Sequence, residues 1–283
     1  MGNYWTTLPA PAPFTPTQLF LGPASTLTDA APPALSHADI VYDPANPAPT
    51  LGGDNLEIKC GPIDQRPLES RPDVLVFTGP VLKAPLALSG PLVADVYFST
   101  NVTDTDVTVS LMDVYPDGRA ILIADGIVRA RWRLFPSTNL PSPLSGNPAD
   151  VYHAHVSLWN STYVFPPGHA VRLHVSSSNW PRFMPNKNTG VPMSAYDGSP
   201  NVTAGTTFWM GGGPTTASSI TLPIVSYPGA LPAFPVEALA DAPRYAPLLA
   251  RLVAMGSARE DESFGDFIVR RMAPIMRRLQ RLV

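Results

Sequence analysis

Histidines are the residues best suited to acid–base or metal chemistry here, and there are five: His37, His153, His155, His169 and His174. His153 and His155 are two positions apart, which places both imidazoles on one face of an extended strand. A general base needs a nucleophile within hydrogen-bond reach, and the sequence puts none beside them. We therefore interpret them as histidines of a sheet surface or a domain interface. A zinc site made by His153, His155 and His174 is the alternative on ligand type.

Carboxylates are the second group with possible chemistry. Calcium takes several oxygen ligands, and five aspartates lie close together in the sequence: Asp104, Asp106, Asp113, Asp117 and Asp125. Asp117 and Asp125 stand in turn-like sequences, whereas Asp104 and Asp106 precede a strand. Structural roles are favoured over calcium, and we expect no metal and no cofactor.

Nucleophilic catalysis by serine has a recognisable sequence pattern, G-x-S-x-G on a turn between a strand and a helix. The chain contains no such pattern and no alternation of strands with helices. Its single cysteine, Cys60, excludes an internal disulfide and a cysteine-based zinc site. We interpret Cys60 as a small buried hydrophobic residue.

Arginines form a stripe in the middle of the chain. Arg129, Arg131 and Arg133 alternate with Val128, Ala130, Trp132 and Leu134, which puts the guanidinium groups on one face of a strand. The stripe is either a docking face for a hydrolase domain or another subunit, or a solvated face with acidic partners.

The elements that position these residues are predicted to be short strands. Val107, Val109 and Leu111 alternate with polar residues, Pro116-Asp117-Gly118 supplies a turn, and residues 120–124 follow as a second strand. An Asp125-Gly126 turn then leads to a third strand over 127–134, with Trp132 on its apolar face. We predict that this meander is the centre of stability.

Further strands are predicted at 74–78, 86–89, 92–100, 151–159, 162–165, 169–176, 206–210 and 219–225. Gly79-Pro80 and Gly90-Pro91 read as turns between the earlier ones. About ten short strands at even spacing, with 35 prolines in the connections, predict a mostly β fold: a jelly-roll, galactose-binding-like β-sandwich.

Composition narrows the function. Only 14% of residues are charged and the net charge is −3, which argues against nucleic-acid binding. There is no signal-peptide pattern and no run of about 18 apolar residues. The compartment is not predicted.

Four stretches in order carry a family resemblance. They are residues 42–53 (YDPANPAPTLGG), 64–77 (DQRPLESRPDVLVF), 104–133 (DTDVTVSLMDVYPDGRAILIADGIVRARWR) and 168–190 (GHAVRLHVSSSNWPRFMPNKNTG). They resemble the C-terminal, non-catalytic domain of the X-Pro dipeptidyl-peptidase and cocaine-esterase-like serine hydrolases. The resemblance implies a jelly-roll sandwich. It also implies a Ser-Asp-His triad in a separate α/β-hydrolase domain.

One loop of the resemblance is a candidate interface or ligand site, with Trp180, Arg182, Phe183 and Asn188 as its residues. In the family, sandwich loops pack against the hydrolase and help to wall its substrate cleft. The aromatic residues could instead stack on a sugar, or simply pin the loop to its own domain.

We expect three regions. Residues 1–40 form a proline-rich lead, in which Met1–Trp5 resembles the end of a hydrolase domain; residues 41–225 form the sandwich; residues 226–283 form an Arg-rich helical tail.

The tail has an apolar stripe at helical spacing, made by Phe264, Ile268, Ile275, Leu279 and Leu282. Isolated helices of this length need a packing surface, so we expect the stripe to contact the sandwich, a protein partner or, less favoured, an anionic membrane surface.

The sequence therefore predicts an accessory, non-catalytic sandwich that acts with a hydrolase domain in cis or trans. The alternatives are a structural or assembly subunit docked through the C-terminal helix, and a module that binds carbohydrate or another ligand.

Overall fold

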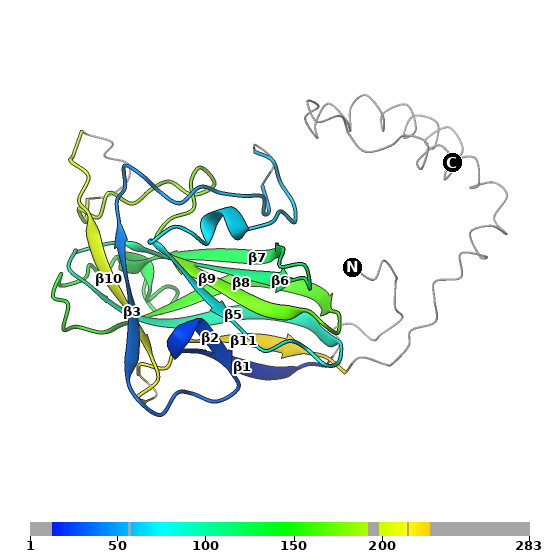
Figure 1. The fold of residues 1–283 in the computed structure, drawn as a ribbon. Coiled ribbons are helices and arrows are strands. Elements are labelled where there is room, and N and C mark those ends of the chain that lie inside the picture. The colour runs from blue at the N-terminus through cyan, green and yellow to red at the C-terminus, as the bar shows by residue number, and fades with distance from the viewer. Residues whose placement is uncertain (1–12, 56–57, 192–197, 214, 227–283) are drawn as a thin grey trace, which may run out of the picture. The chain divides into compact units, whose positions relative to one another are not determined.

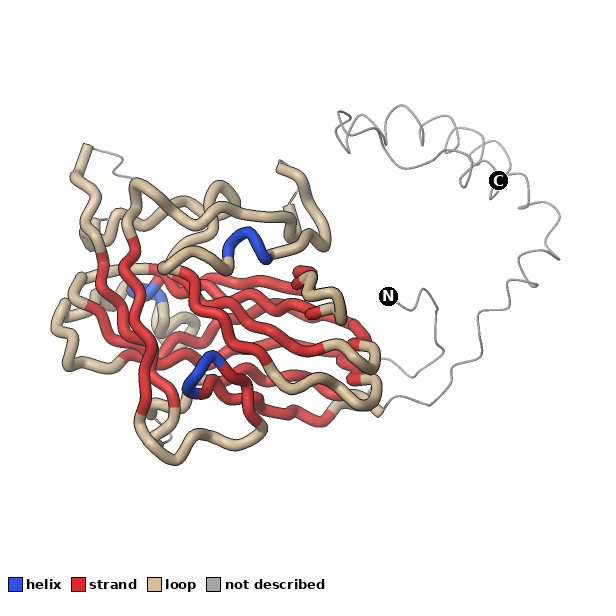
Figure 2. Tube along the Cα trace, in the orientation of Figure 1, coloured by secondary structure: helices blue, strands red, loops and turns tan. Residues whose placement is uncertain are grey.

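The computed structural model describes residues 13–55, 58–191, 198–213 and 215–226. Within these ranges the protein is mostly β (Figures 1 and 2). The strands are β1 (Thr15–Gly22), β2 (Thr26–Thr28), β3 (Ser36–Tyr42), β4 (Val74–Thr78), β5 (Leu86–Thr100), β6 (Asp106–Val114), β7 (Ala120–Arg129), β8 (Tyr152–Phe165), β9 (Ala170–Ser176), β10 (Ala204–Met210) and β11 (Ser219–Ile224). Three short 3₁₀ helices accompany them: η1 (Pro23–Ser25), η2 (Arg66–Leu68) and η3 (Ala130–Trp132).

The described strands form one large sheet in the order β3-β10-β5-β11-β1-β2-β4-β9-β6-β7, with β8 paired to β5. The parallel bridge Thr26↔Thr78 between β2 and β4 links its two halves. In Figure 1 the run β9-β6-β7 lies above the run β11-β1. Side chains from both halves, such as Phe98 of β5 and Leu111 of β6, belong to one buried cluster. The arrangement is consistent with a β-sandwich.

The hairpin at Pro116-Asp117-Gly118 is confirmed. Gly118 has a φ of 87°, a conformation that glycine adopts without strain. The N–H of Tyr115 donates to the carbonyl of Arg119 at 2.8 Å, and the N–H of Arg119 donates to the carboxylate of Asp117 at 3.1 Å. The turn joins β6 to β7, as the sequence predicts.

The predicted turn at Asp125-Gly126 and the third strand over 127–134 are wrong. Both residues lie inside β7, where Ser110 pairs with Asp125 and Val109 with Gly126. Pairing ends at Arg129, after which the chain enters η3, because the N–H of Ala130 donates to the carbonyl of Thr105 at 2.8 Å. The expected alternation of arginines and apolar residues along one strand therefore ends at Arg129.

Trp132 is consequently not a core residue. Its side chain is 41% exposed, whereas Ala130 is fully buried. Truncating Trp132 therefore lacks the large cavity cost expected of a buried tryptophan. In the described part of the chain, Val107, Val109 and Leu111 of β6 supply buried apolar side chains of the meander.

Another predicted turn lies inside a long strand, next to a bulge. Gly90-Pro91 lies within β5, and the predicted strands at 151–159 and 162–165 are one strand, β8. β5 and β8 pair along their whole length, from Leu86↔Phe165 to Phe98↔Tyr152, with a register shift between Pro91 and Val93. The bulge accommodates the proline, which cannot donate to the ladder.

The sheet also begins earlier than residue 41. β1, β2 and most of β3 lie within the predicted lead, and β1 pairs with β2 and β11. Of the lead, residues 1–12 lie outside the described residues, as does the predicted helical tail from residue 227 on, with its apolar stripe.

Candidate docking face and loop site

The arginine stripe is held by the two aspartates before and at the start of β6. Arg129 forms a bidentate ion pair with Asp106, with both distances 2.9 Å. Arg131 binds Asp104 through its Nε at 2.7 Å and its backbone N–H at 2.9 Å. Asp104 and Asp106 are essentially inaccessible to solvent, and Arg131 is 7% exposed. Burial raises the pKa of the Asp106 carboxyl, against the opposing effect of Arg129.

The third arginine of the stripe also bonds within the chain. Arg133 donates to the backbone carbonyls of Ala130 and Ser142, and its guanidinium lies 4.8 Å from the ring centroid of Tyr152. All three guanidinium groups are thus used internally, and docking of a partner on this face stays a prediction. Asp104 and Asp106, two of the aspartates that the sequence offers for calcium, are the counter-ions of Arg131 and Arg129.

The same two aspartates anchor the loop that follows β9. Asn186 donates from one amide nitrogen to Asp104 and to Asp106, both at 3.0 Å. The backbone carbonyl of Asn186 accepts from the buried hydroxyl of Tyr42 at 3.1 Å. Arg131 adds a bond to the carbonyl of Val191 at 2.9 Å. One buried polar network therefore fixes the stripe and the loop together.

A second anchor lies at the start of the loop. Asp125 of β7 accepts from Arg182, and its other oxygen accepts from Asn179 at 3.0 Å. Trp180 bridges to Pro49, and its N–H donates to the carbonyl of Ala48 at 2.9 Å. The loop over 179–191 and the loop over 46–53 thus share one face of the protein.

The candidate loop residues divide into anchors and exposed side chains. Asn188 is 2% exposed with a φ of 63°, and Arg182 is mostly buried and stands 5.0 Å from the Phe183 ring centroid. Trp180, at 44% exposed, and Met184, at 43%, present apolar surface. Met184 was not singled out from the sequence, since a single methionine in a loop carries no pattern.

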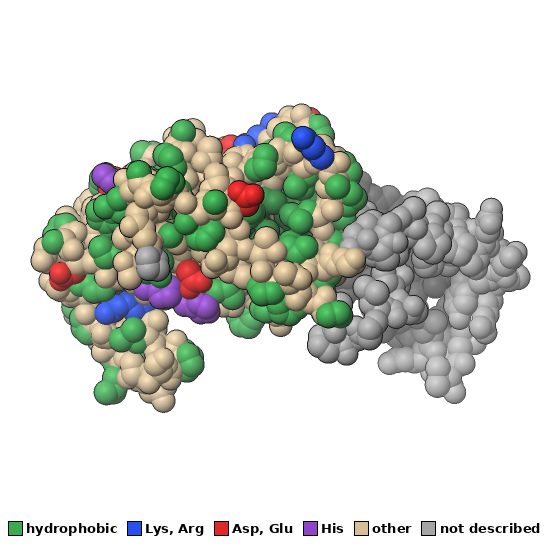
Figure 3. Space-filling model, turned by 90° about the horizontal axis from the view of Figure 1, so that it is seen from below, with side chains coloured by type: hydrophobic (Ala, Val, Ile, Leu, Met, Phe, Trp, Pro, Cys, Tyr) green, Lys and Arg blue, Asp and Glu red, His purple; other side chains and the backbone are tan. Residues whose placement is uncertain are grey.

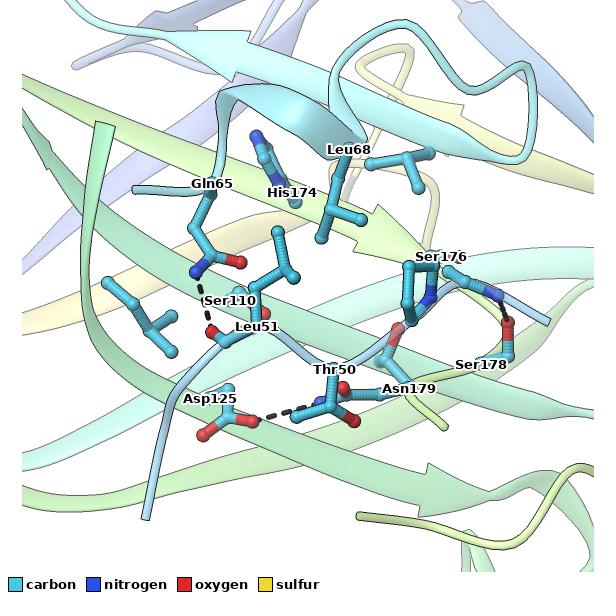
Figure 4. A pocket seen from close by; sticks show the side chains of 15 residues that line it. Thr50, Leu51, Gln65, Leu68, Ser110, Asp125, His174, Ser176, Ser178 and Asn179 are labelled. Atoms are coloured by element: carbon cyan, nitrogen blue, oxygen red, sulfur yellow. Dashed lines mark hydrogen bonds between the residues drawn. The ribbon is translucent and has the colours of Figure 1, made fainter. Parts of the chain in front are cut away.

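A small cavity lies beneath these loops (Figure 4). Its volume is about 30 Å³, and its lining includes Thr50, Gln65, Ser110 and His174. That volume is enough for a water molecule and too small for an organic ligand. Gln65, 3% exposed, donates to the carbonyls of Leu51 and Ile63. The cavity therefore belongs to the packing of the covering loop.

The five histidines contact four different carboxylates: Asp39, Glu69, Asp95 and Asp113. His153 and His155 of β8 both contact one oxygen of Asp95, at 2.8 and 3.0 Å. His174 is buried on β9, 3.4 Å from Glu69, so the zinc set of His153, His155 and His174 is not brought together. The contact with His174 and the hydrogen bond from Arg172 lower the pKa of Glu69.

A buried cluster that the sequence did not reveal joins the end of β6 to the turn before β9. His169 binds Asp113 at 2.8 Å, and the hydroxyl of Tyr163 donates to the same carboxylate at 2.8 Å. Burial, followed by the hydrogen bond to Asp113, raises the pKa of Tyr163. The spacing of 56 residues between Asp113 and His169 gives no local signal. No group of three His, Cys, Asp or Glu residues suited to a metal ion occurs in the described part of the chain.

Loop rigidity can be tested at Arg182. We expect Arg182→Met to speed amide exchange at Trp180 and Asn188 by about tenfold or more, because the Asp125 carboxylate loses its cation and the loop opens more readily. Arg66→Met, which removes an exposed pair with Asp64, is the matched control and should leave both amides unchanged. Unchanged exchange in Arg182→Met, measured by mass spectrometry or NMR, would show that this pair does not hold the loop.

Mostly β architecture with loops fixed over one face places the chain among sandwich-like β domains. A family model described as the X-Pro dipeptidyl-peptidase C-terminal non-catalytic domain matches residues 2–213. The chain belongs to this family. In the described residues no helix is long and apolar enough to cross a membrane.

Similar proteins are hydrolases. The cocaine esterase of Rhodococcus sp. (strain MB1 Bresler) is 42% identical over 152 residues, which is 53% of this chain and 26% of that protein. An aminopeptidase from a marine sediment Thaumarchaeota archaeon matches in structure with a TM-score of 0.69 and 28% identity, over 79% of this chain and 39% of that one. An α-amino acid ester hydrolase matches with a TM-score of 0.64 and 28% identity, over 74% and 36%. The chain thus spans about a quarter to two fifths of the length of these relatives.

Proposed function

We propose that this chain is the accessory jelly-roll domain of a CocE/NonD-type serine hydrolase and serves its α/β-hydrolase domain in cis or trans. The observation that carries the proposal is the family match over residues 2–213, supported by relatives that are an esterase, an aminopeptidase and an ester hydrolase. The parent activity is cleavage of X-Pro peptides or of acyl esters and amides.

The docking surface is the loop face defined by residues 46–53 and 179–191. Trp180 and Met184 offer exposed apolar side chains, and such anchors commonly dominate protein interfaces. The ion pairs of Arg129, Arg131 and Arg182 hold the loops in one conformation, which lowers the entropy lost on docking. Residues 226–283 add a second contact through their apolar stripe, and this stripe is also the basis of the alternative role as an assembly subunit.

The isolated chain should be inactive. We expect no hydrolysis of p-nitrophenyl esters or X-Pro-p-nitroanilides and no labelling by a fluorophosphonate probe, because the sequence has no nucleophile turn. The Rhodococcus cocaine esterase, assayed in parallel, provides the positive control. Stoichiometric labelling of any serine of this chain would contradict a non-catalytic role.

An accessory role predicts that the domain supports a related hydrolase. In a chimera, residues 13–226 replace the matching part of the Rhodococcus cocaine esterase. We expect esterase activity well above that of the remaining hydrolase part alone. Trp180→Ala with Met184→Ala should reduce that activity, whereas Phe14→Ala, which removes a 40% exposed aromatic side chain just before β1, should not. A chimera that folds and is no more active than the hydrolase part alone contradicts the proposal.

A further inference from the structure

A second hollow lies on the opposite half of the sheet from the loop face. Its volume is about 470 Å³, within the range of small-molecule sites, and its lining includes Gln18, Phe20, Ala31, Asp95, Tyr97 and Ser219. Phe20 pairs with Ser219, Ser219 with Asp95, and Asp95 with His155. One row of side chains therefore crosses β1, β11, β5 and β8.

Asp95 is held in place by the two histidines beside it. His153 and His155 contact the same carboxylate oxygen, Oδ1, at 2.8 and 3.0 Å. Within the described residues no hydrogen bond reaches the other oxygen, Oδ2. Figure 3 views the protein from below and shows histidine and carboxylate side chains gathered together on this surface. The two imidazoles orient a carboxylate and leave one of its oxygens for a ligand.

The charge of the hollow favours a cation. Of the side chains that line it, all within the described part of the chain, Asp95 alone carries a formal charge, and neither lysine nor arginine is among them. Burial, together with the Asp95 charge, raises the pKa of Tyr97, so its hydroxyl stays neutral. An anionic ligand would be repelled by the Asp95 carboxylate.

The rest of the lining suits the body of an organic cation. Phe20 and Tyr97 supply aromatic surface, which attracts cations through the ring face, and His153 stacks on Tyr97 at 4.8 Å between ring centroids. Gln18 and Ser219 add neutral hydrogen-bonding groups. We propose that this hollow binds a small organic cation, a primary ammonium group on an aromatic or apolar body, with the ammonium on Asp95. The inference does not rest on the proposed function.

Three probes of one shape test the charge preference on the full-length chain: benzylamine as its ammonium ion, neutral benzyl alcohol and benzoate. In NMR titrations at pH 7.5, we expect benzylammonium to shift the amide signals of Tyr97 and Ser219 and to bind about tenfold more tightly than benzyl alcohol. Benzoate should not bind. Methyl glucoside serves as a neutral sugar control. Equal binding of benzyl alcohol, or tighter binding of methyl glucoside, would overturn the proposal. So would the absence of a shift at Tyr97 and Ser219 at about 10 mM benzylammonium, a concentration well above a Kd of about 1 mM.

Two variants locate the ammonium. Asp95→Asn keeps the shape and removes the charge, so we expect the affinity for benzylammonium to fall to that for benzyl alcohol. Asp39→Asn is the matched control, since Asp39 is an exposed carboxylate beside His37 on β3 and does not line the hollow. Melting curves of both variants report whether they fold. If Asp95→Asn fails to fold, the probe series on the unaltered chain still decides the outcome. Undiminished binding by a folded Asp95→Asn variant would show that the carboxylate is not the contact.

Discussion

Arg131→Met is expected to destabilise the protein by about 3–5 kcal/mol, because it leaves the buried carboxylate of Asp104 without its cation. Asp104 is fully buried, and the Arg131 guanidinium is 2.7 Å from it. The same change removes the bond from Arg131 to the carbonyl of Val191, which ties the loop over 179–191 to the sandwich. For a domain of this size the melting temperature should fall by about 6–20 °C.

Two further variants separate the buried charge from other effects. Arg119→Met removes an exposed pair with Asp117, and such pairs contribute about 0–1 kcal/mol, so its melting temperature should hardly change. Adding Asp104→Asn to Arg131→Met removes the uncompensated charge and should recover part of the lost stability. If the double variant melts below Arg131→Met, the cost lies in lost hydrogen bonds and packing rather than in an unpaired carboxylate.

Strand positions were predictable wherever a strand alternates between apolar and polar residues. Val107, Val109 and Leu111 define β6, and the turn at Gly118 was evident because its proline, aspartate and glycine each favour it. The sequence was misleading at Gly90-Pro91 and Asp125-Gly126, where turn-like pairs lie inside paired strands. Whether a glycine marks a turn or a close approach between strands depends on what the fold brings opposite it, and that is tertiary information.

The resemblance located the loop over 179–191, but the sequence could not show how the loop is held. Asp125 and Arg182 are 57 residues apart, and Asn186 reaches two aspartates about 80 residues earlier. Alternation in Arg129, Arg131 and Arg133 predicted an exposed stripe, either a docking face or a solvated face with acidic partners, because charged residues usually face water. Buried counter-ions reverse that expectation, and only the pairing of β6 with β7 brings them into reach.

Gly126→Ala should be the most harmful single-methyl change in the strands. A Cβ at Gly126 would lie 2.1 Å from the carbonyl oxygen and 2.9 Å from the carbonyl carbon of Ser157. Both atoms belong to the backbone of β8, which is paired with β5. The clash therefore cannot be relieved by the rotation of a side chain. We expect a loss of about 3 kcal/mol, at the upper end of overpacking costs, and a melting temperature lower by about 6–12 °C.

Gly205→Ala is the matched control for that change. Gly205 also lies in a strand, β10, and neither glycine has a positive φ, but the nearest atom to a Cβ at Gly205 is 3.7 Å away on the Asn101 side chain. Replacement of a glycine that has room is neutral or slightly stabilising, by up to about 1 kcal/mol, because the unfolded chain loses freedom. Opposite shifts of the melting temperature in the two variants would therefore assign the damage at Gly126 to the approach of β7 to β8. Equal shifts would show that β7 and β8 can separate at Gly126 without cost to the core.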